Sequence, residues 1–321
     1  MTEAAISCLP LRGFEVDSLL AFLAHLGLLR SLEAARPEWR PRTSWTGPPW
    51  RAQLAIGAAV SEAEVARAAA EGIEALAARF DADGRANVGF TGEEFRSYAK
   101  RVQQDPVGGR LAAALTAEWP ETKKGTLQAA PLVMMFGAGH QNFLDRLVAV
   151  PRGELPSRLR NAKRPPDMRD PVRIAEALFA PWRRADDADG FRWDPEEDQR
   201  YALRFDNPSK AGAAPTVHGA NRLAAIGFLS FPCLAGSRRI TTPGTARESG
   251  GRVSFLWPVW TVPLSLHGVE NLLVHPELVA CRLDKLRPFG VAEIYRARRV
   301  NNDRYMNVTR AAPVSGDRSG Q

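Results

Sequence analysis

Acidic side chains crowded between positions 186 and 198 are the residues whose types and spacing most plainly suggest chemistry. The set consists of Asp186, Asp187, Asp189, Asp194, Glu196, Glu197 and Asp198. Carboxylates that converge can hold divalent cations and catalyse hydrolysis of a phosphodiester. The residues considered for such a metal-dependent nuclease are Asp186, Asp187, Asp194 and Asp198, with His140 or His218.

Arginines alternate with these acids, and they favour a second interpretation. Guanidinium groups clamp carboxylates in two-pronged ion pairs, and nearby positive charge weakens a cation site. The arginines of this segment are Arg183, Arg184, Arg192, Arg200 and Arg204. We therefore expect a fixed lattice of ion pairs and no catalytic site, with the nuclease kept as the alternative. The stretch 170–222 is also rich in Trp and Phe, and we expect the rest of the chain to serve as its scaffold.

The bulk properties limit the class of protein. The chain has 321 residues, a net charge of +7 and a pI near 9.7. This positive charge is consistent with binding of an anionic partner, and equally with a charged surface that serves only solubility. Cys8, Cys233 and Cys281 lie far apart and form no CxxC pair, so we expect no disulfide framework, zinc site or other cofactor. The apolar run 19–29 is too short to span a membrane, and no signal-peptide pattern is present, so we expect a cytoplasmic protein.

Apolar spacing and capping residues define the elements that must position these groups. Helices are predicted near 19–32, 61–80, 91–103, 142–150, 171–179 and 218–229. Ser61 with Glu64, and Thr91 with Glu94, have the spacing of capping boxes. β-Branched and aromatic runs predict a hairpin within 238–260 and a strand pair within 288–310.

We therefore predict an α+β fold, with a helix-rich N-terminal half and a C-terminal half of mixed helices and antiparallel strands. The organisation expected is a helix-rich part over 1–150, a basic Pro-rich linker over 151–169, an Arg- and Trp-rich α+β part over 170–312, and a disordered tail over 313–321.

Arginines gather on the predicted C-terminal strands and their turns, where surplus positive charge could neutralise phosphates. The residues expected to contact phosphates are Arg238, Arg239, Arg252, Arg298 and Arg299. Asn221, Arg222 and Lys210, at or near a helix start, are expected to lie close to bases. Arg183 and Arg184 complete the candidate nucleic-acid contacts, although local acids favour a structural role for Arg183.

Several uncommon motifs, in this order, resemble those of type I-G (formerly I-U) CRISPR-associated proteins. They are FLAxLGLLR at 22–30, GAGHQ followed by FL at 137–144, a block of WRRADD and RWDPEEDQRYAL over 182–203, GANRLA at 219–224, and W-P-x-W at 257–260. The resemblance covers most of the chain. The resemblance is to one of two members of this group, a Cascade large-subunit-like protein or an extension of the helicase–nuclease.

The resemblance implies a non-catalytic subunit of an RNA-guided effector complex. Its implied partners are the crRNA-loaded backbone and foot subunits of Cascade, target double-stranded DNA and the helicase–nuclease. In such complexes guide pairing reads sequence, while protein recognises a flanking motif and stabilises the R-loop. A protein-only assembly factor of the same complex is a further alternative.

Overall fold

The computed structural model describes residues 7–122, 125–134, 142–155, 168–197, 216–236, 239–248, 251–302 and 305–314. Within them the fold is mixed α+β, as predicted, and helices dominate the first part of the chain. The expected linker lies mostly outside the described residues, and so does most of the expected tail.

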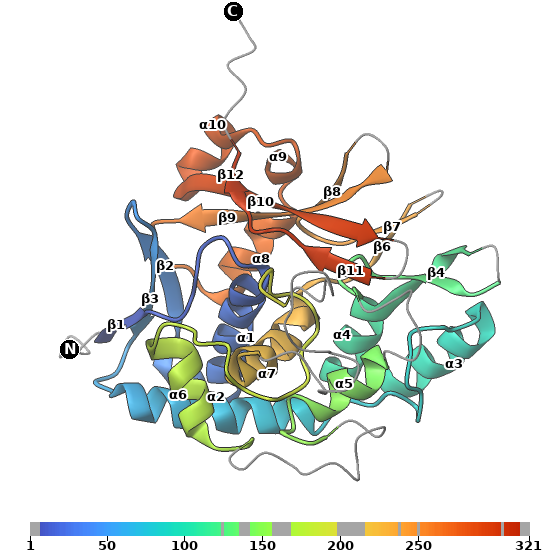
Figure 1. The fold of residues 1–321 in the computed structure, drawn as a ribbon, viewed down its shortest axis with the longest axis horizontal. Coiled ribbons are helices and arrows are strands. Elements are labelled where there is room, and N and C mark those ends of the chain that lie inside the picture. The colour runs from blue at the N-terminus through green and yellow to red at the C-terminus, as the bar shows by residue number, and fades with distance from the viewer. Residues whose placement is uncertain are drawn as a thin grey trace, which may run out of the picture.

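Helices and short strands alternate through the first part of the chain (Figure 1). They are β1 (Ser7–Leu11), α1 (Leu19–Ala35), β2 (Arg42–Thr46), β3 (Arg51–Ile56), α2 (Glu62–Ala77), α3 (Gly92–Val102), α4 (Pro106–Leu115), β4 (Thr116–Glu121), β5 (Leu127–Ala129), α5 (Phe143–Ala149) and α6 (Pro171–Phe179). Both predicted capping boxes are present, Ser61 with Glu64 at α2 and Thr91 with Glu94 at α3.

The last third begins with one helix and then becomes strand-rich. Its elements are α7 (His218–Gly227), β6 (Leu234–Ala235), β7 (Ile240–Thr241), β8 (Thr245–Arg247), β9 (Val253–Trp260), α8 (Leu266–Val274), α9 (Pro276–Val279), α10 (Leu283–Leu286), β10 (Val291–Asn302), β11 (Tyr305–Val308) and β12 (Ala312–Pro313). The predicted hairpin and strand pair are therefore β8 with β9 and β10 with β11.

Helix α7 lies at the centre of the molecule, and all ten of its residues are buried. Glycines allow its backbone to touch its neighbours. A Cβ on Gly27 of α1 would lie 1.8 Å from the Leu223 carbonyl oxygen, and one on Gly227 would lie 1.9 Å from that of Leu23. A Cβ on Gly219 would meet the Arg173 carbonyl oxygen of α6 at 2.0 Å. Only glycine permits these helices to pack so closely.

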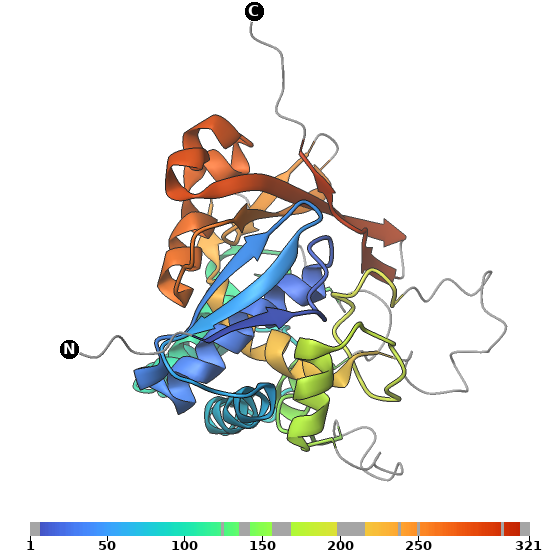
Figure 2. The ribbon, with the colours of Figure 1, turned by 90° about the vertical axis from the view of Figure 1, so that its left-hand side faces the viewer.

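The C-terminal sheet has the order β11-β10-β9-β8, with β12 also paired to β10 and all pairs antiparallel. It covers α1, where the rings of Phe22 and Trp257 stack at 5.4 Å. A second antiparallel sheet, β1-β3-β2, lies beside α1 and faces the viewer in Figure 2. Trp260 joins the two sheets by donating from Nε1 to the Thr43 carbonyl oxygen at 2.6 Å. Buried residues from both predicted parts thus form one core.

In the described parts of the stretch 170–222, residues 170–197 and 216–222, the large aromatic side chains belong to this core, although we expected the rest of the chain to present them. Phe191 and Trp193 are fully buried, and they stack at 4.4 Å in a ring cluster with Phe143 and Phe228. Burial of large aromatic rings is favourable in proportion to the apolar area removed from water. The buried aromatic side chains of this stretch therefore contribute to the stability of the core.

Candidate nucleic-acid interface

Arg247 and Arg299 lie at one end of the C-terminal sheet, and Arg239, beside the separate β6–β7 sheet, is close enough to interact electrostatically with Arg247. Arg239 precedes β7, Arg247 ends β8, and Arg299 lies near the end of β10. Arg247 pairs with Val253, while Arg298 pairs with Ser254, so Arg299 shares the sheet face of Val253 and Arg247. The ends of β7, β8 and β10 lie on the same side of the molecule, at the right in Figure 1. We call Arg239, Arg247 and Arg299 the arginine cluster.

Like charges surround one another in the arginine cluster. Burial lowers the pKa of Arg247, and the neighbouring charge of Arg239 lowers it further. Burial likewise lowers the pKa of Arg299, with a second contribution from Arg247. Within the described part of the chain, no carboxylate forms an ion pair with any of the three; the side-chain contacts they make are to the Gly251 and Pro131 carbonyl oxygens. Guanidinium groups stay protonated despite such shifts, so the cluster presents uncompensated positive charge.

Arg298 differs from its neighbour on β10, because an acid already neutralises it. Its Nε lies 3.1 Å from both carboxylate oxygens of Glu248, and Arg296 lies 4.0 Å from the same group. A hydrogen bond from Ser254, together with these arginines, lowers the pKa of Glu248. Arg252 is exposed beside the turn that follows β8 and has no ion pair among the described residues. Of the expected phosphate contacts, Arg239, Arg252 and Arg299 thus remain available, whereas Arg238 lies outside the described residues.

Asn221 and Arg222 are fully buried, so the prediction that they contact bases or phosphates is wrong for this conformation. Asn221 donates from Nδ2 to Thr216 Oγ1 and to the Val217 carbonyl oxygen. Arg222 donates from Nε to the Pro151 carbonyl oxygen at 3.1 Å and from Nη1 to that of Arg169 at 3.3 Å. The sequence placed them correctly at the start of a helix, but the helix is central. Lys210 lies outside the described residues.

Arg222 instead ties together the two ends of the segment 151–169. Burial, with the nearby charge of Arg169, lowers the pKa of Arg222 to about 10, so it remains charged at neutral pH. Its replacement would leave the buried Pro151 carbonyl oxygen and the partly buried Arg169 carbonyl oxygen without this donor.

We expect Arg222→Ala to lower the free energy of unfolding by about 2–3 kcal/mol, measured by urea denaturation. Arg222→Lys should recover little of this, because one ammonium group cannot reproduce the planar fork that reaches both carbonyls. The salt dependence of nucleic-acid binding should not change in the folded variant. If Arg222→Ala is as stable as the unmodified protein and its nucleic-acid binding depends less on salt, Arg222 contacts the nucleic acid after all.

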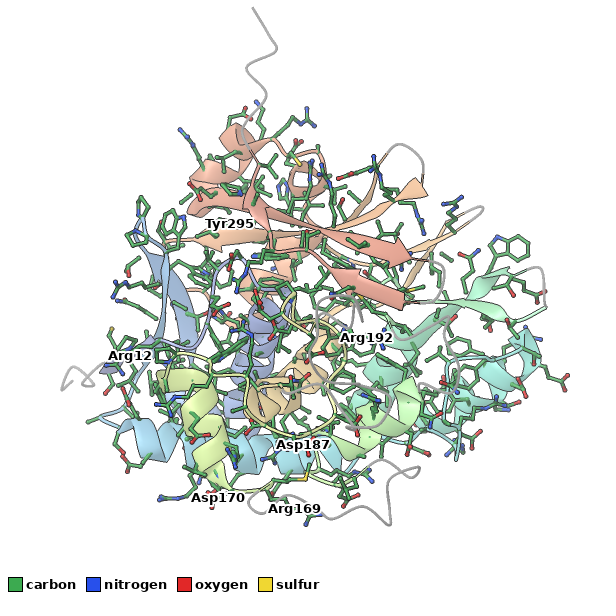
Figure 3. All side chains as sticks on the ribbon, viewed as in Figure 1. Arg12, Arg169, Asp170, Asp187, Arg192 and Tyr295 are labelled. Carbon is green, nitrogen blue, oxygen red and sulfur yellow. The ribbon has the colours of Figure 1, made fainter. Side chains whose placement is uncertain are left out.

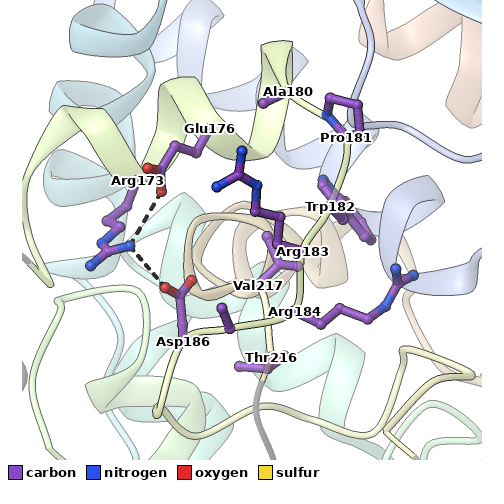
Figure 4. Close-up of a pocket in the computed structure, with 11 residues that line it drawn as sticks. Arg173, Glu176, Ala180, Pro181, Trp182, Arg183, Arg184, Asp186, Thr216 and Val217 are labelled. Carbon is purple, nitrogen blue, oxygen red and sulfur yellow. Dashed lines mark hydrogen bonds and ion pairs between the residues drawn. The ribbon is translucent and has the colours of Figure 1, made fainter.

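A cavity of about 300 Å³ lies between the end of α6 and residues 180–186, and the remaining predicted arginines line it (Figure 4). Arg184 points away from its centre and is held by Asp194 at 2.9 Å and Glu15 at 3.0 Å. These hydrogen bonds raise the pKa of Arg184 against the opposing effect of burial. Arg183 is exposed at the cavity and makes no ion pair with the described residues.

The central acids are bound by arginines, in agreement with the expected lattice. Asp186 accepts from Arg173 at 2.9 Å and from the backbone of His218, while Asp189 pairs with Arg146 at 2.7 Å. Arg310 adds bonds to Glu15, Asp17 and Glu196 from the C-terminal region. Asp187 lies apart from this lattice, near the lower edge of Figure 3 that also holds Arg169 and Asp170.

A nuclease centre would require these carboxylates to converge. Over the described ranges, no three His, Cys, Asp or Glu side chains gather in a way that would hold a metal ion. Asp198, the fourth acid proposed, lies outside those ranges. His140, one of the two histidines considered, also lies outside them. The described acids Asp186, Asp189 and Asp194 form ion pairs with arginines.

Arg247 is the member of the arginine cluster that we did not select from the sequence. Its position just before the Gly250-Gly251 turn of the predicted hairpin was the available signal. Its electrostatic interaction with Arg299 depends on strand pairing between segments far apart in the sequence.

Comparison of the chain with protein-family models, with curated proteins and with solved structures gave no match. Among the described residues, no helix combines the length and apolar character needed to cross a bilayer.

Proposed function

We propose that this protein is a non-catalytic nucleic-acid-binding subunit of a type I-G RNA-guided effector complex. It would contact target DNA near the flanking motif, stabilise the R-loop and help to recruit the helicase–nuclease. The sequence motifs are the reason for proposing this family. The arginine cluster is the observation that supports nucleic-acid binding. The cluster has no carboxylate partner among the described residues, whereas Arg173 and Arg184 of the central stretch each pair with an aspartate.

Backbone phosphates are the ligand that this geometry favours. Arginine forks match phosphate oxygens, and neutralising phosphates releases condensed counterions. Two of the cluster's side chains, Arg239 and Arg247, are exposed. Arg299 is half-buried and held near the Pro131 carbonyl oxygen, which fixes its direction. Such a site would bind any duplex through its backbone, while guide pairing supplies sequence discrimination.

The test is duplex binding by a double variant, Arg239→Gln with Arg247→Gln, at several salt concentrations. Each phosphate contact contributes about 0.9 to the slope of log K against log salt, so the slope should fall by about 2. Affinity near 0.1 M salt should fall between about ten- and one hundred-fold. Fluorescence anisotropy with a labelled duplex measures both quantities.

The matched control is Arg42→Gln with Arg51→Gln, which removes the same charge from exposed positions on β2 and β3. These strands lie on the opposite side of the molecule in Figure 1. If both double variants fold and bind alike, the cluster is not the nucleic-acid interface. The protein-only assembly role would then be the better proposal.

A further inference from the structure

An exposed tryptophan lies on the element that packs beside the arginine cluster. Trp119 of β4 is 56% exposed, and Leu234 of β6 is 54% exposed. Strand β4 contacts both β6 and β7, and these strands lie between β4 and the C-terminal sheet in Figure 1. Large exposed rings are costly in water and are common where an unpaired base stacks.

Hydrogen bonds fix the position of this strand relative to the cluster. The Cys233 backbone nitrogen donates to the Ala113 carbonyl oxygen at 2.7 Å, which anchors the β6–β7 hairpin to the junction of α4 and β4. Arg239 follows the turn of that hairpin. On the other side, Arg299 reaches Pro131, just after β5, the strand that pairs with β4. Hydrogen bonds thus link the region of the β4–β5 hairpin both to the β6–β7 hairpin that carries Arg239 and to Arg299 itself.

We propose that this surface binds a single-stranded nucleic acid, with phosphates on the arginine cluster and one base stacked on Trp119. The inference rests on the proposed nucleic-acid-binding function and adds the class of ligand to it. A paired base cannot offer its face to a side chain, whereas an unpaired one can. Trp119 would therefore contribute to single-strand binding and not to duplex binding.

The experiment compares Trp119→Ala with the unmodified full-length protein on four probes of equal length: oligo(dT), oligo(U), an abasic deoxyribose-phosphate oligomer and duplex DNA. Trp119→Ala should weaken binding to the stacking strand between about five- and one hundred-fold, with an unchanged salt slope. Binding to the abasic oligomer and to duplex should not change. Comparison of oligo(dT) with oligo(U) shows whether the strand is DNA or RNA. Trp119→Phe, which keeps a ring, should retain most of the affinity.

The outcomes separate this inference from the proposed function. Equal affinity of Trp119→Ala and unmodified protein for both single strands, or an equal loss on the abasic oligomer, would overturn stacking. Duplex binding that responds to the arginine variants would leave the proposed function intact in either case. Failure to bind any of the four probes would remove both.

Discussion

Replacing Gly27 with alanine is expected to lower the free energy of unfolding by at least about 3 kcal/mol. The added Cβ would lie 1.8 Å from the Leu223 carbonyl oxygen, and this oxygen belongs to the backbone of the central helix α7. A flexible side chain could move aside, but a helix backbone moves only if α1 and α7 separate. Their separation would disturb the tightest packing in the core. Urea denaturation monitored by tryptophan fluorescence measures the loss.

A matched control and a double variant make this prediction specific. No heavy atom lies within 4 Å of a Cβ built on Gly89, so Gly89→Ala should change stability by less than about 0.5 kcal/mol. Gly227→Ala meets the Leu23 carbonyl oxygen at the same crossing. The two core substitutions together should cost less than the sum of their separate effects, because the helices separate only once. Similar values for Gly27→Ala and Gly89→Ala would contradict the close packing described here.

Substitution of His25 is expected to change how stability depends on pH. His25 lies fully buried in α1, with its ring 5.2 to 5.5 Å from the rings of Phe14, Trp45 and Trp260. Neither ring nitrogen has a hydrogen-bond partner among the residues that the structure describes. Burial lowers the pKa of His25 from 6.5 to about 3. Between pH 6.5 and 3 the unfolded chain therefore binds a proton at His25 that the folded protein does not bind. The free energy of unfolding falls by about 1.4 kcal/mol for each pH unit as the pH decreases through this range.

Glu197 has the opposite effect over an overlapping pH range. It is buried, and although Thr216 and the Arg192 backbone donate to it, burial raises its pKa from 4.5 to about 7. The folded protein holds a proton that the unfolded chain releases, so stability falls as pH rises from 4.5 to 7. Between pH 4.5 and 6.5 the contributions of His25 and Glu197 have similar size and opposite sign.

Substitution of either His25 or Glu197 should therefore reveal the effect of the remaining group on the pH dependence of the free energy of unfolding. Between pH 4.5 and 6.5, the stability of His25→Leu relative to the unmodified protein should become greater at low pH by about 3 kcal/mol. Glu197→Gln should show the reverse difference. Parallel stability curves for His25→Leu and the unmodified protein would show that the buried imidazole does not titrate as described.

The sequence determined the features that depend on neighbouring residues. Ser61 and Thr91 begin helices because each side chain caps an amide three residues along the chain, and Asp170 with Pro171 begins α6 in the same local way. The mixed α+β class also followed from the change of apolar period along the chain. Alternation of Arg and Asp in the central stretch predicted ion pairs there, but it did not identify the pair of Arg184 with Asp194, because Arg184 was a candidate nucleic-acid contact.

The tertiary structure decided which positive charges remain uncompensated. Arg298 and Arg299 are adjacent in sequence and were equivalent candidates, yet the pleat of β10 directs them to opposite faces. Arg298 forms a hydrogen bond with Glu248, fifty residues away, whereas Arg299 lies on the face where the charge of Arg247 repels it. Arg222 could not be recognised as buried, because its helix has polar residues at its start and only the glycine contacts with α1 and α6 place it in the centre. Charge is encoded residue by residue, but its compensation depends on distances between segments that only packing brings together.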